Sequence, residues 1–440
     1  MEEFLKKIKI EKSTTTTTTT TIMVLLETFG NLKKFLQPPR SIIDNGVHVM
    51  HYRWTTLLFM ASCTLVSLNQ FFGNPIQCIT NDDLKPFSEK FINTYCWIQS
   101  TFSVKTAWNK TIGVDVPYPG VDKYLNDGQI TYHSYYQWVG ILLFLQGVTF
   151  YLPHSIWKSK ESGRIKKLQL NLDKIHFTDE NDRYKQLRLL AEYFISGGQR
   201  NHWFFNWFII VELLQFLNII IQIWLIDKFL GGYFHPYGPD VYHFLMDYNS
   251  GGEHSITNPM IRIFPRLTKC TFRMFGSSGS LERHDTLCIL SINIVNEKIY
   301  IFLWFWLYTL VSITGLSLIY RLCTLFIHRV RTKRIQKQLS NSVDYYHIDS
   351  IVRYLNTDQW FLLNLLLKNI DPYNGNELLL MMEKILRENH GDDDDNHPLM
   401  ANNGGSSIPK SMESKSMELS FINNNRHNNQ MIDDEKMKIT

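Results

Sequence analysis

Four of the six cysteines fall into two pairs with the same internal spacing. Cys78 and Cys96 are separated by 17 residues, and so are Cys270 and Cys288. Four cysteines can form two disulfides in three ways. We favour pairing between the two segments, which would join them covalently, and pairing within each segment is the alternative. A zinc site formed by Cys270, His284 and Cys288 is conceivable, but cysteines in an oxidising compartment more often form disulfides.

Polar residues also recur within a strongly apolar segment. Glu212, Gln215, Asn218 and Gln222 follow one another at steps of three, three and four residues, which places them on one face of a helix. A carboxylate within a membrane-spanning helix is costly and by default indicates function or a polar lumen. Because three of the four residues are amides, we favour hydrogen bonding between helices as their role.

The remaining chemical groups do not form an enzyme site. The sequence has no Gly-rich phosphate loop, nucleophile elbow, paired carboxylates or metal-ligand helix, so we expect neither an enzyme nor a bound cofactor. His133, His235 and His254 are expected at the surface. Asn109 begins the only N-glycosylation sequon. A net charge of +4 is too small to indicate a nucleic-acid partner.

The elements that must position these residues are membrane spans. Although only 44% of the 440 residues are hydrophobic, they are concentrated in stretches that approach the roughly 20 residues needed to cross a bilayer as a helix. Trp and Tyr gather at several ends of these stretches, as is typical of side chains at the lipid headgroups. The four predicted spans are 54–72, 135–152, 203–226 and 299–320. We expect them to contact membrane lipid.

Basic residues predict the orientation of these spans. The segment 153–202 contains ten Lys and Arg residues, whereas 73–134 contains five Lys and no Arg. Basic flanks remain in the cytosol, so 153–202 and both termini are predicted to be cytoplasmic. The four paired cysteines and Asn109 then lie outside the cell, where disulfides persist.

Three features of the segments predicted to be cytoplasmic, or next to them, lead to further predictions. Leu25, Leu26 and Phe29 recur at helical spacing before Pro38, which indicates an amphipathic helix that could lie on the membrane. Pro153 either ends the second span or bends it. The apolar stretch 360–367 is too short to span a membrane and is predicted to be a buried helix.

Several motifs resemble the innexins, the gap-junction proteins of invertebrates. They are Tyr135-Tyr-Gln-Trp138, Asn93-Thr-Tyr-Cys-Trp-Ile98, Asn293-Ile-Val-Asn-Glu-Lys-Ile299, Lys269-Cys-Thr-Phe272 and the stretch 276–288. The likeness covers about residues 23–387. It implies an all-α membrane protein with four transmembrane helices, disulfide-tied extracellular loops and a helical cytoplasmic domain.

The resemblance also implies function and site residues. Innexin-like subunits form homo- or hetero-oligomeric rings, with eight subunits implied, around a wide pore in the plasma membrane. Two rings of adjacent cells dock through the outer loops at gap junctions and pass ions and small metabolites passively. The family pattern pairs Cys78 with Cys288 and Cys96 with Cys270. The resemblance also implies that the amphipathic helix folds into the pore mouth and that the first span lines much of the pore. The pore-lining candidates are therefore Leu25, Leu26, Phe29, Asn69 and Gln70.

Taken together, these arguments predict an organisation of the chain. A disordered extension (1–22) precedes a cytoplasmic segment with the pore helix (23–53), and the later parts are a span (54–72), an extracellular loop (73–134), a span (135–152), a cytoplasmic loop (153–202), a span (203–226), an extracellular loop (227–298), a span (299–320), a cytoplasmic helical region (321–389) and a disordered tail (390–440).

Two departures from the family pattern bear on function. Residues 1–22 precede Met23, where the family chain normally begins, so either the extension hangs at the pore mouth or Met23 is the true start. A glycan on Asn109 could oppose docking and leave an unpaired hemichannel. The alternative function is a pore-less four-span adhesion or scaffold protein. A secondary transporter would need more spans and broken helices.

Overall fold

The computed structural model describes part of the chain. It covers residues 42–79, 88–123, 129–169, 172, 180–196, 203–249, 258–339 and 344–390. By internal contacts the chain divides into two units, Met1–Asn389 and His390–Thr440. The predictions for residues 1–41, which include Leu25, Leu26 and Phe29, and for the tail after residue 390 lie outside the described residues.

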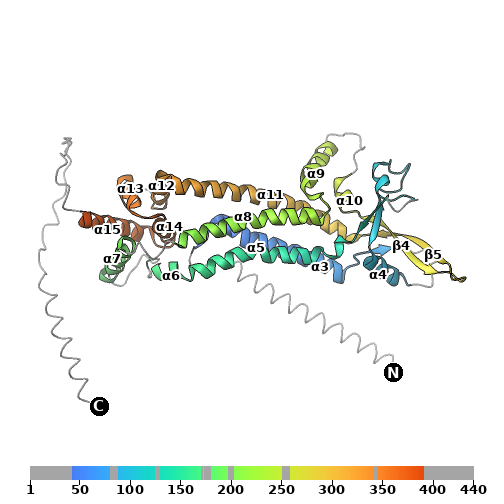
Figure 1. Ribbon diagram of the computed structural model, residues 1–440, viewed down its shortest axis with the longest axis horizontal. Coiled ribbons are helices and arrows are strands. Elements are labelled where there is room, and N and C mark those ends of the chain that lie inside the picture. The colour runs from blue at the N-terminus through green and yellow to red at the C-terminus, as the bar shows by residue number, and fades with distance from the viewer. Residues whose placement is uncertain are drawn as a thin grey trace, which may run out of the picture. The chain divides into compact units, whose positions relative to one another are not determined.

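Four long apolar helices form the centre of the first unit (Figure 1). Each is long and apolar enough to cross a membrane, which confirms the four-span helical fold. α3 and α5 pack together, α5 packs against α8, and α11 contacts both α3 and α8. The first helix runs through α2 (Gly46–Val49), the π-helical η1 (Met50–Thr55) and α3 (Thr56–Phe72), and the others are α5 (Val139–Glu161), α8 (Phe204–Phe229) and α11 (Ser291–Phe326).

The second helix continues past Pro153. α5 extends to Glu161, so the interpretation that Pro153 ends the helix is wrong. A proline inside a helix removes one backbone hydrogen bond, but His154 and Trp157 in the following turn are both buried. Their packing outweighs the lost bond, because helix stability in proteins comes mainly from tertiary contacts.

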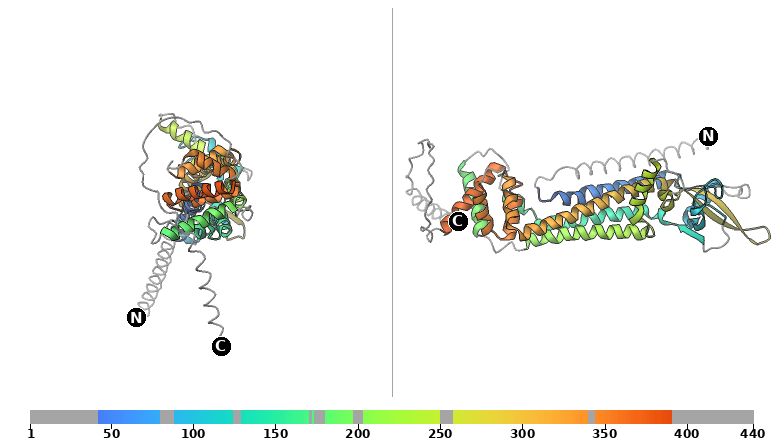
Figure 2. Two further views of the ribbon diagram at one scale, coloured as in Figure 1. Left: turned by 90° about the vertical axis from the view of Figure 1, so that its left-hand side faces the viewer. Right: turned by 90° about the horizontal axis from the view of Figure 1, so that it is seen from above.

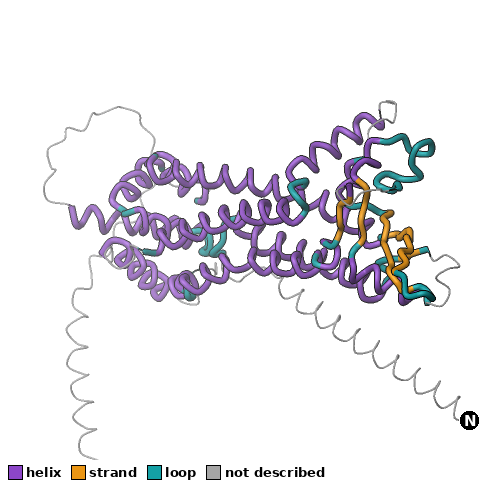
Figure 3. Tube along the Cα trace, turned by 45° about the vertical axis from the view of Figure 1, so that its right-hand side comes forward, coloured by secondary structure: helices purple, strands orange, loops and turns teal. Residues whose placement is uncertain are grey.

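The loop between the first and second spans and the loop between the third and fourth spans fold into one domain, here called the outer domain, around a five-stranded sheet (Figure 3). The strand order is β1-β5-β4-β2-β3, and every pair is antiparallel. The strands of the first loop therefore flank those of the second on both sides. The first loop contains β1 (Gln77–Cys78), α4 (Glu89–Gln99), β2 (Thr101–Val104), η3 (Lys105–Asn109), β3 (Ile130–His133) and the short η5 (Tyr135–Gln137). The second contains α9 (Phe234–Asn249), α10 (Pro259–Ile263), β4 (Leu267–Phe275) and β5 (Leu281–Ile289).

The all-helical description is thus correct for the spans but omits this sheet. The signal for it was present in Leu267–Phe275, where Cys270, Phe272 and Met274 alternate with polar residues, and Cys270 and Phe272 are buried in the structure. Such alternation is typical of a strand with one buried face. The partners of these strands lie in a loop far away in the sequence, so the local pattern could not complete the sheet.

The helices that follow the opposite ends of the spans form a second domain. Its helices are α6 (Arg164–Gln169), α7 (Glu180–Ser196), α12 (His328–Gln338), α13 (Tyr345–Tyr354), α14 (Thr357–Leu366) and α15 (Pro372–His390). α14 is buried along its whole second half, as predicted for the apolar stretch 360–367. Figure 2 shows these helices gathered beyond the ends of the four spans.

Candidate functional site

Two disulfides connect the extracellular loops to each other. Cys78 in β1 lies directly opposite Cys288 in β5, and their sulfur atoms are 2.06 Å apart. Cys96 in α4 is bonded to Cys270 in β4, with an S–S distance of 2.07 Å. All four side chains are buried. The connections run between the loops, in the pairing that the resemblance implied.

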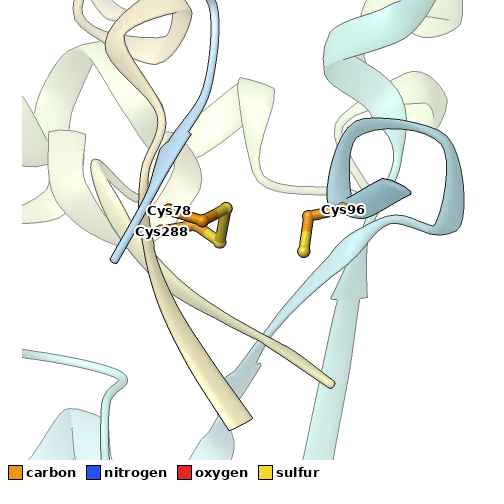
Figure 4. Close-up of side chains that lie close together, drawn as sticks. All are labelled: Cys78, Cys96 and Cys288. Atoms are coloured by element: carbon orange, nitrogen blue, oxygen red, sulfur yellow. A yellow bond between two sulfur atoms is a disulfide. The ribbon is translucent and has the colours of Figure 1, made fainter. Parts of the chain in front are cut away.

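Cys96, one end of the second bridge, lies close to the Cys78–Cys288 bridge (Figure 4). The sulfur atoms of Cys78, Cys96 and Cys288 are within 4.8 Å of one another. Zinc binds cysteine as the thiolate, and each of these sulfurs is already part of a disulfide. The chemistry of this cluster is therefore covalent cross-linking rather than metal binding.

Hydrogen bonds hold the backbone beside each bridge. The Cys78 N–H donates to Oδ1 of Asn93 at 2.8 Å, so α4 supports β1 through Asn93 and β4 through the Cys96 bridge. The Thr286 hydroxyl donates to the Cys270 carbonyl at 3.2 Å. The motif at residues 93–98 thus contributes one residue to the surroundings of each bridge.

The motif Tyr135–Trp138 joins the outer domain to the second span. The Tyr135 hydroxyl donates to the Ile263 carbonyl at 3.1 Å, and the Gln137 amide donates to the Trp97 carbonyl. Tyr136 is fully buried. One short segment therefore holds α4, α10 and the start of α5 together.

An ion pair between the half-exposed Arg266 and the buried Glu297 fixes the outer end of the fourth span. Arg266 donates to both carboxylate oxygens of Glu297, at 2.7 and 3.1 Å, and these bonds raise the pKa of Arg266. Glu297 is fully buried, and the Asn293 amide donates to the Pro265 carbonyl at 2.8 Å. The motif 293–299 therefore attaches α11 to the segment that enters β4.

The polar face of the third span points into the subunit. Glu212, Gln215 and Gln222 are buried. Arg321 of α11 donates to both oxygens of Glu212 at 2.8 and 3.0 Å, while Gln222 donates to Thr149 of α5 at 3.0 Å and to Asn218 at 3.3 Å. These contacts fit inter-helix hydrogen bonding rather than the lining of a pore.

Sequence reasoning missed a polar cluster at the inner end of the first span. His48 stacks on Phe208 with ring centres 4.9 Å apart, and its Nε2 lies 4.0 Å from Glu212. His154 stacks on Tyr52 at 3.7 Å, and its Nδ1 is 3.6 Å from Asp44. The residues are scattered over three spans, so only their shared burial after folding reveals the cluster.

The pore-lining candidates within the described residues lie at the outer end of α3. Asn69 and Gln70 are partly exposed there. The Asn69 carbonyl accepts from the Gly73 N–H at 3.0 Å and ends the helix. Their side chains are thus available at the surface of the subunit, next to the outer domain.

Asn109 is exposed at the end of η3. It borders a pocket of about 1010 Å³ together with residues of α9 and α10, among them Asp240 and Arg262. Lys110 beside it forms an ion pair with Asp122 at 2.5 Å. A glycan on Asn109 would therefore leave the protein beside α9.

His133 is buried, contrary to the prediction that it lies at the surface. Its Nε2 is 2.8 Å from the Ser103 hydroxyl on the neighbouring strand β2. Burial lowers the pKa of His133 to about 4, so the side chain is neutral at physiological pH. His235 is exposed as predicted, and its Nδ1 lies 2.6 Å from the Tyr308 hydroxyl. His254 lies outside the described residues.

Comparisons with a family model and with curated proteins all indicate the same family. The innexin family model matches residues 44–386. The chain is 39% identical to innexin inx2 of Drosophila melanogaster over 360 residues, which are 81% of this chain and 94% of that protein. It is 40% identical to innexin inx3 of the same fly over 341 residues, 77% and 84% of the two chains. Innexin shaking-B, again from Drosophila melanogaster, is 39% identical over 350 residues, 79% and 91% of the two chains. The four spans, the outer domain and these matches together show that the chain belongs to the innexin family.

Proposed function

We infer that this protein is a subunit of gap-junction channels, as innexins are. The observation that carries this proposal is the outer domain, in which both extracellular loops form one sheet cross-linked by two disulfides. A preformed surface loses little conformational entropy when it meets a partner. Such a surface suits docking between the membranes of two cells.

The proposed channel is a ring of these subunits in the plasma membrane, with eight per ring as the family suggests. Both termini and the helical domain of α12–α15 face the cytosol, in keeping with the ten basic residues of 153–202. Ions and small metabolites cross a wide hydrated lumen passively, so pore radius and lining charge determine selectivity. We propose no enzymatic activity.

We propose that the lumen is lined by the segment before the first span and by α3. Asn69 and Gln70 supply polar groups at the outer end of α3, and Leu25, Leu26 and Phe29 would lie at the cytoplasmic mouth. The burial of Glu212 and Gln215 within the subunit supports placing their face outside this lining.

The decisive experiment is electrical recording from paired cells that express the protein. Replacement of all four bridged cysteines, C78S, C96S, C270S and C288S, should abolish coupling, because the loops lose the bridges that preform the docking surface. The free thiol Cys323, which lies in α11 outside the proposed lining, offers a control, and C323S should couple as the wild type does. Surface biotinylation must show that each variant reaches the membrane. Undiminished coupling in the quadruple variant would contradict the proposal.

The same recordings address the two departures from the family pattern. A chain that begins at Met23 should couple better than the full chain if residues 1–22 obstruct the pore mouth. N109Q should increase coupling if a glycan on Asn109 opposes docking. The current through unpaired hemichannels should be the same in N109Q and in the wild type. Dye transfer between cells separates a channel from a pore-less adhesion protein, for which a rigid outer domain would be equally useful.

A further inference from the structure

The helix that follows the fourth span is strongly basic. α12 (His328–Gln338) contains five Lys and Arg residues and no acidic residue. It begins directly after α11, where Ile327 adopts an extended conformation that breaks the helix. Figure 2 shows α12 running across the end of α11 rather than continuing its direction.

Two of the five cations serve the structure of the protein. Arg331 donates to the Thr324 carbonyl at 2.7 Å and to the Leu325 carbonyl, both in the last turn of α11. The guanidinium of Arg334 lies over the ring of Tyr320, 5.6 Å from its centre. These contacts hold α12 beside the end of α11.

The other three cations point outward. Arg329, Lys333 and Lys337 follow one another at intervals of four residues, so they share one face of α12. All three are exposed, and within the described residues none of them forms an ion pair. We call these three residues the α12 basic face.

Further positive charge lies behind this face. Lys368 and Arg334 are largely buried, and burial together with the neighbouring cations Arg334 and Arg321 lowers the pKa of Lys368. Arg321 likewise lowers the pKa of Arg334, after the larger effect of burial. Arg321 is paired with Glu212, so within the described residues the cations here without an ion-pair partner are Arg334 and Lys368, and an anion near α12 would relieve their repulsion.

The position of α12 relative to the bilayer indicates which anion this is. The first residues of α11 contact the outer domain through Asn293 and Glu297, so the hydrocarbon part of the helix begins after them. A core of ~30 Å then requires about 20 residues, which ends the span close to Tyr320. Because Arg334 packs on Tyr320, α12 lies at the depth of the lipid headgroups.

An exposed apolar stripe leads from the span to this helix. Leu316, Ile319, Leu322 and Phe326 follow one another at steps of three or four on α11, and they are 67, 59, 53 and 84% exposed. Acyl chains can cover Leu316 and Ile319, which precede Tyr320, while Leu322 and Phe326 lie at the depth of the headgroups beside the basic face. Clusters of Lys and Arg just cytoplasmic of a span are typical of binding to anionic lipids.

We propose that the α12 basic face, with the apolar stripe of α11, binds anionic phospholipid of the cytoplasmic leaflet. The headgroup phosphate contacts Arg329, Lys333 and Lys337, and the acyl chains lie along Leu316 and Ile319. The proposal relies on the membrane orientation given above and not on docking or conductance. Binding of anionic lipid to this face would make the cytoplasmic domain sensitive to the charge of the lipids around the channel.

The test measures lipid retained by the full-length protein purified in mixed micelles of phosphatidylserine and phosphatidylcholine. We expect the wild type to retain phosphatidylserine in preference to phosphatidylcholine. Each charge contributes on the order of fivefold in affinity, so R329Q/K333Q/K337Q should weaken the preference on the order of a hundredfold. Single variants such as K333Q should each lose about fivefold, which keeps the test valid if the triple variant folds poorly.

A matched control removes three cations elsewhere in the cytoplasmic domain. Lys185 and Arg188 on α7 and Lys384 on α15 are exposed, and K185Q/R188Q/K384Q changes the net charge by the same amount. This control should retain phosphatidylserine as the wild type does. An equal loss in the control would overturn the proposal, because lipid would then respond only to overall charge.

Two further outcomes would also overturn it. If inorganic phosphate displaced the lipid more effectively than chloride at equal ionic strength, the face would be a general anion site rather than a lipid surface. If R329Q/K333Q/K337Q retained phosphatidylserine but eluted as a smaller assembly in gel filtration, the face would be a contact between subunits.

Discussion

At the scale of single residues, buried ionic groups connect the spans at their inner ends. Glu212 of α8 and Arg321 of α11 form a two-bond ion pair in which both side chains are almost fully buried. Arg321 also lies over the ring of Phe208, 4.7 Å from its centre. Burying two charges costs several kcal/mol, and only their mutual hydrogen bonds compensate for it.

Removal of one partner should therefore destabilise the protein strongly. E212Q leaves Arg321 as an unpaired buried cation, and we expect a loss of about 3–5 kcal/mol in the free energy of unfolding. Thermal unfolding in detergent, followed by loss of the monodisperse peak in gel filtration, measures this effect. E192Q breaks the exposed pair with Arg188 and should cost less than about 1 kcal/mol. Equal stability of the two variants would show that the pair is not buried in the assembled protein.

At the scale of elements, α9 is held against the fourth span by close packing. A Cβ atom on Gly238 would lie 2.2 Å from the ring of Trp304, in the middle of the indole rather than at a flexible end. The Trp304 indole N–H donates to the His235 carbonyl at 3.2 Å, which restricts its movement. Only glycine allows α9 to approach α11 this closely.

G238A should displace α9 from α11. We expect a loss of about 1–3 kcal/mol in the free energy of unfolding, because overpacking forces backbone and ring to shift. Faster proteolysis of the second extracellular loop in the folded protein would report the displacement of α9. The matched control is G140A, where the new Cβ would meet the Ser67 hydroxyl at an ordinary 3.4 Å. A G238A protein with unchanged melting temperature and proteolysis would contradict this account of the packing.

At the scale of the whole molecule, the outer domain joins the two halves of the chain. Cys78 and Cys96 precede the second span, whereas Cys270 and Cys288 follow the third, so both bridges connect the halves. The sheet makes the same connection without covalent bonds, because β5 pairs with β1 and β4 pairs with β2.

A cut in the cytoplasmic loop tests this connection directly. A specific protease site inserted within 173–179 should yield two fragments that migrate together on a denaturing gel without reductant and separate once reductant is added. C78S/C96S should separate without reductant, because no cysteine of the first half can then reach the second half. Separation of the wild-type fragments without reductant would mean that each loop closes its own disulfide.

The sequence by itself determined the four spans, and it predicts their orientation. Each of these follows from local composition: about 20 apolar residues make a span, and basic flanks orient it. The buried helix at residues 360–367 could be predicted for the same reason, since it is apolar but too short to cross a bilayer.

The tertiary structure alone decided how distant residues combine. Pro153 was ambiguous because its effect depends on whether Trp157 is buried in the turn that follows. The face of Glu212 and Gln222 could have lined a pore, and only the positions of Arg321 and Thr149 on other helices place it inside the subunit. The sheet could not be derived from either loop, because β4 and β5 are completed by strands of the first loop, and the two disulfides between the loops join residues 174 and 210 positions apart. Contacts between distant segments are not encoded in local periodicity, and so they appear only when the chain is folded.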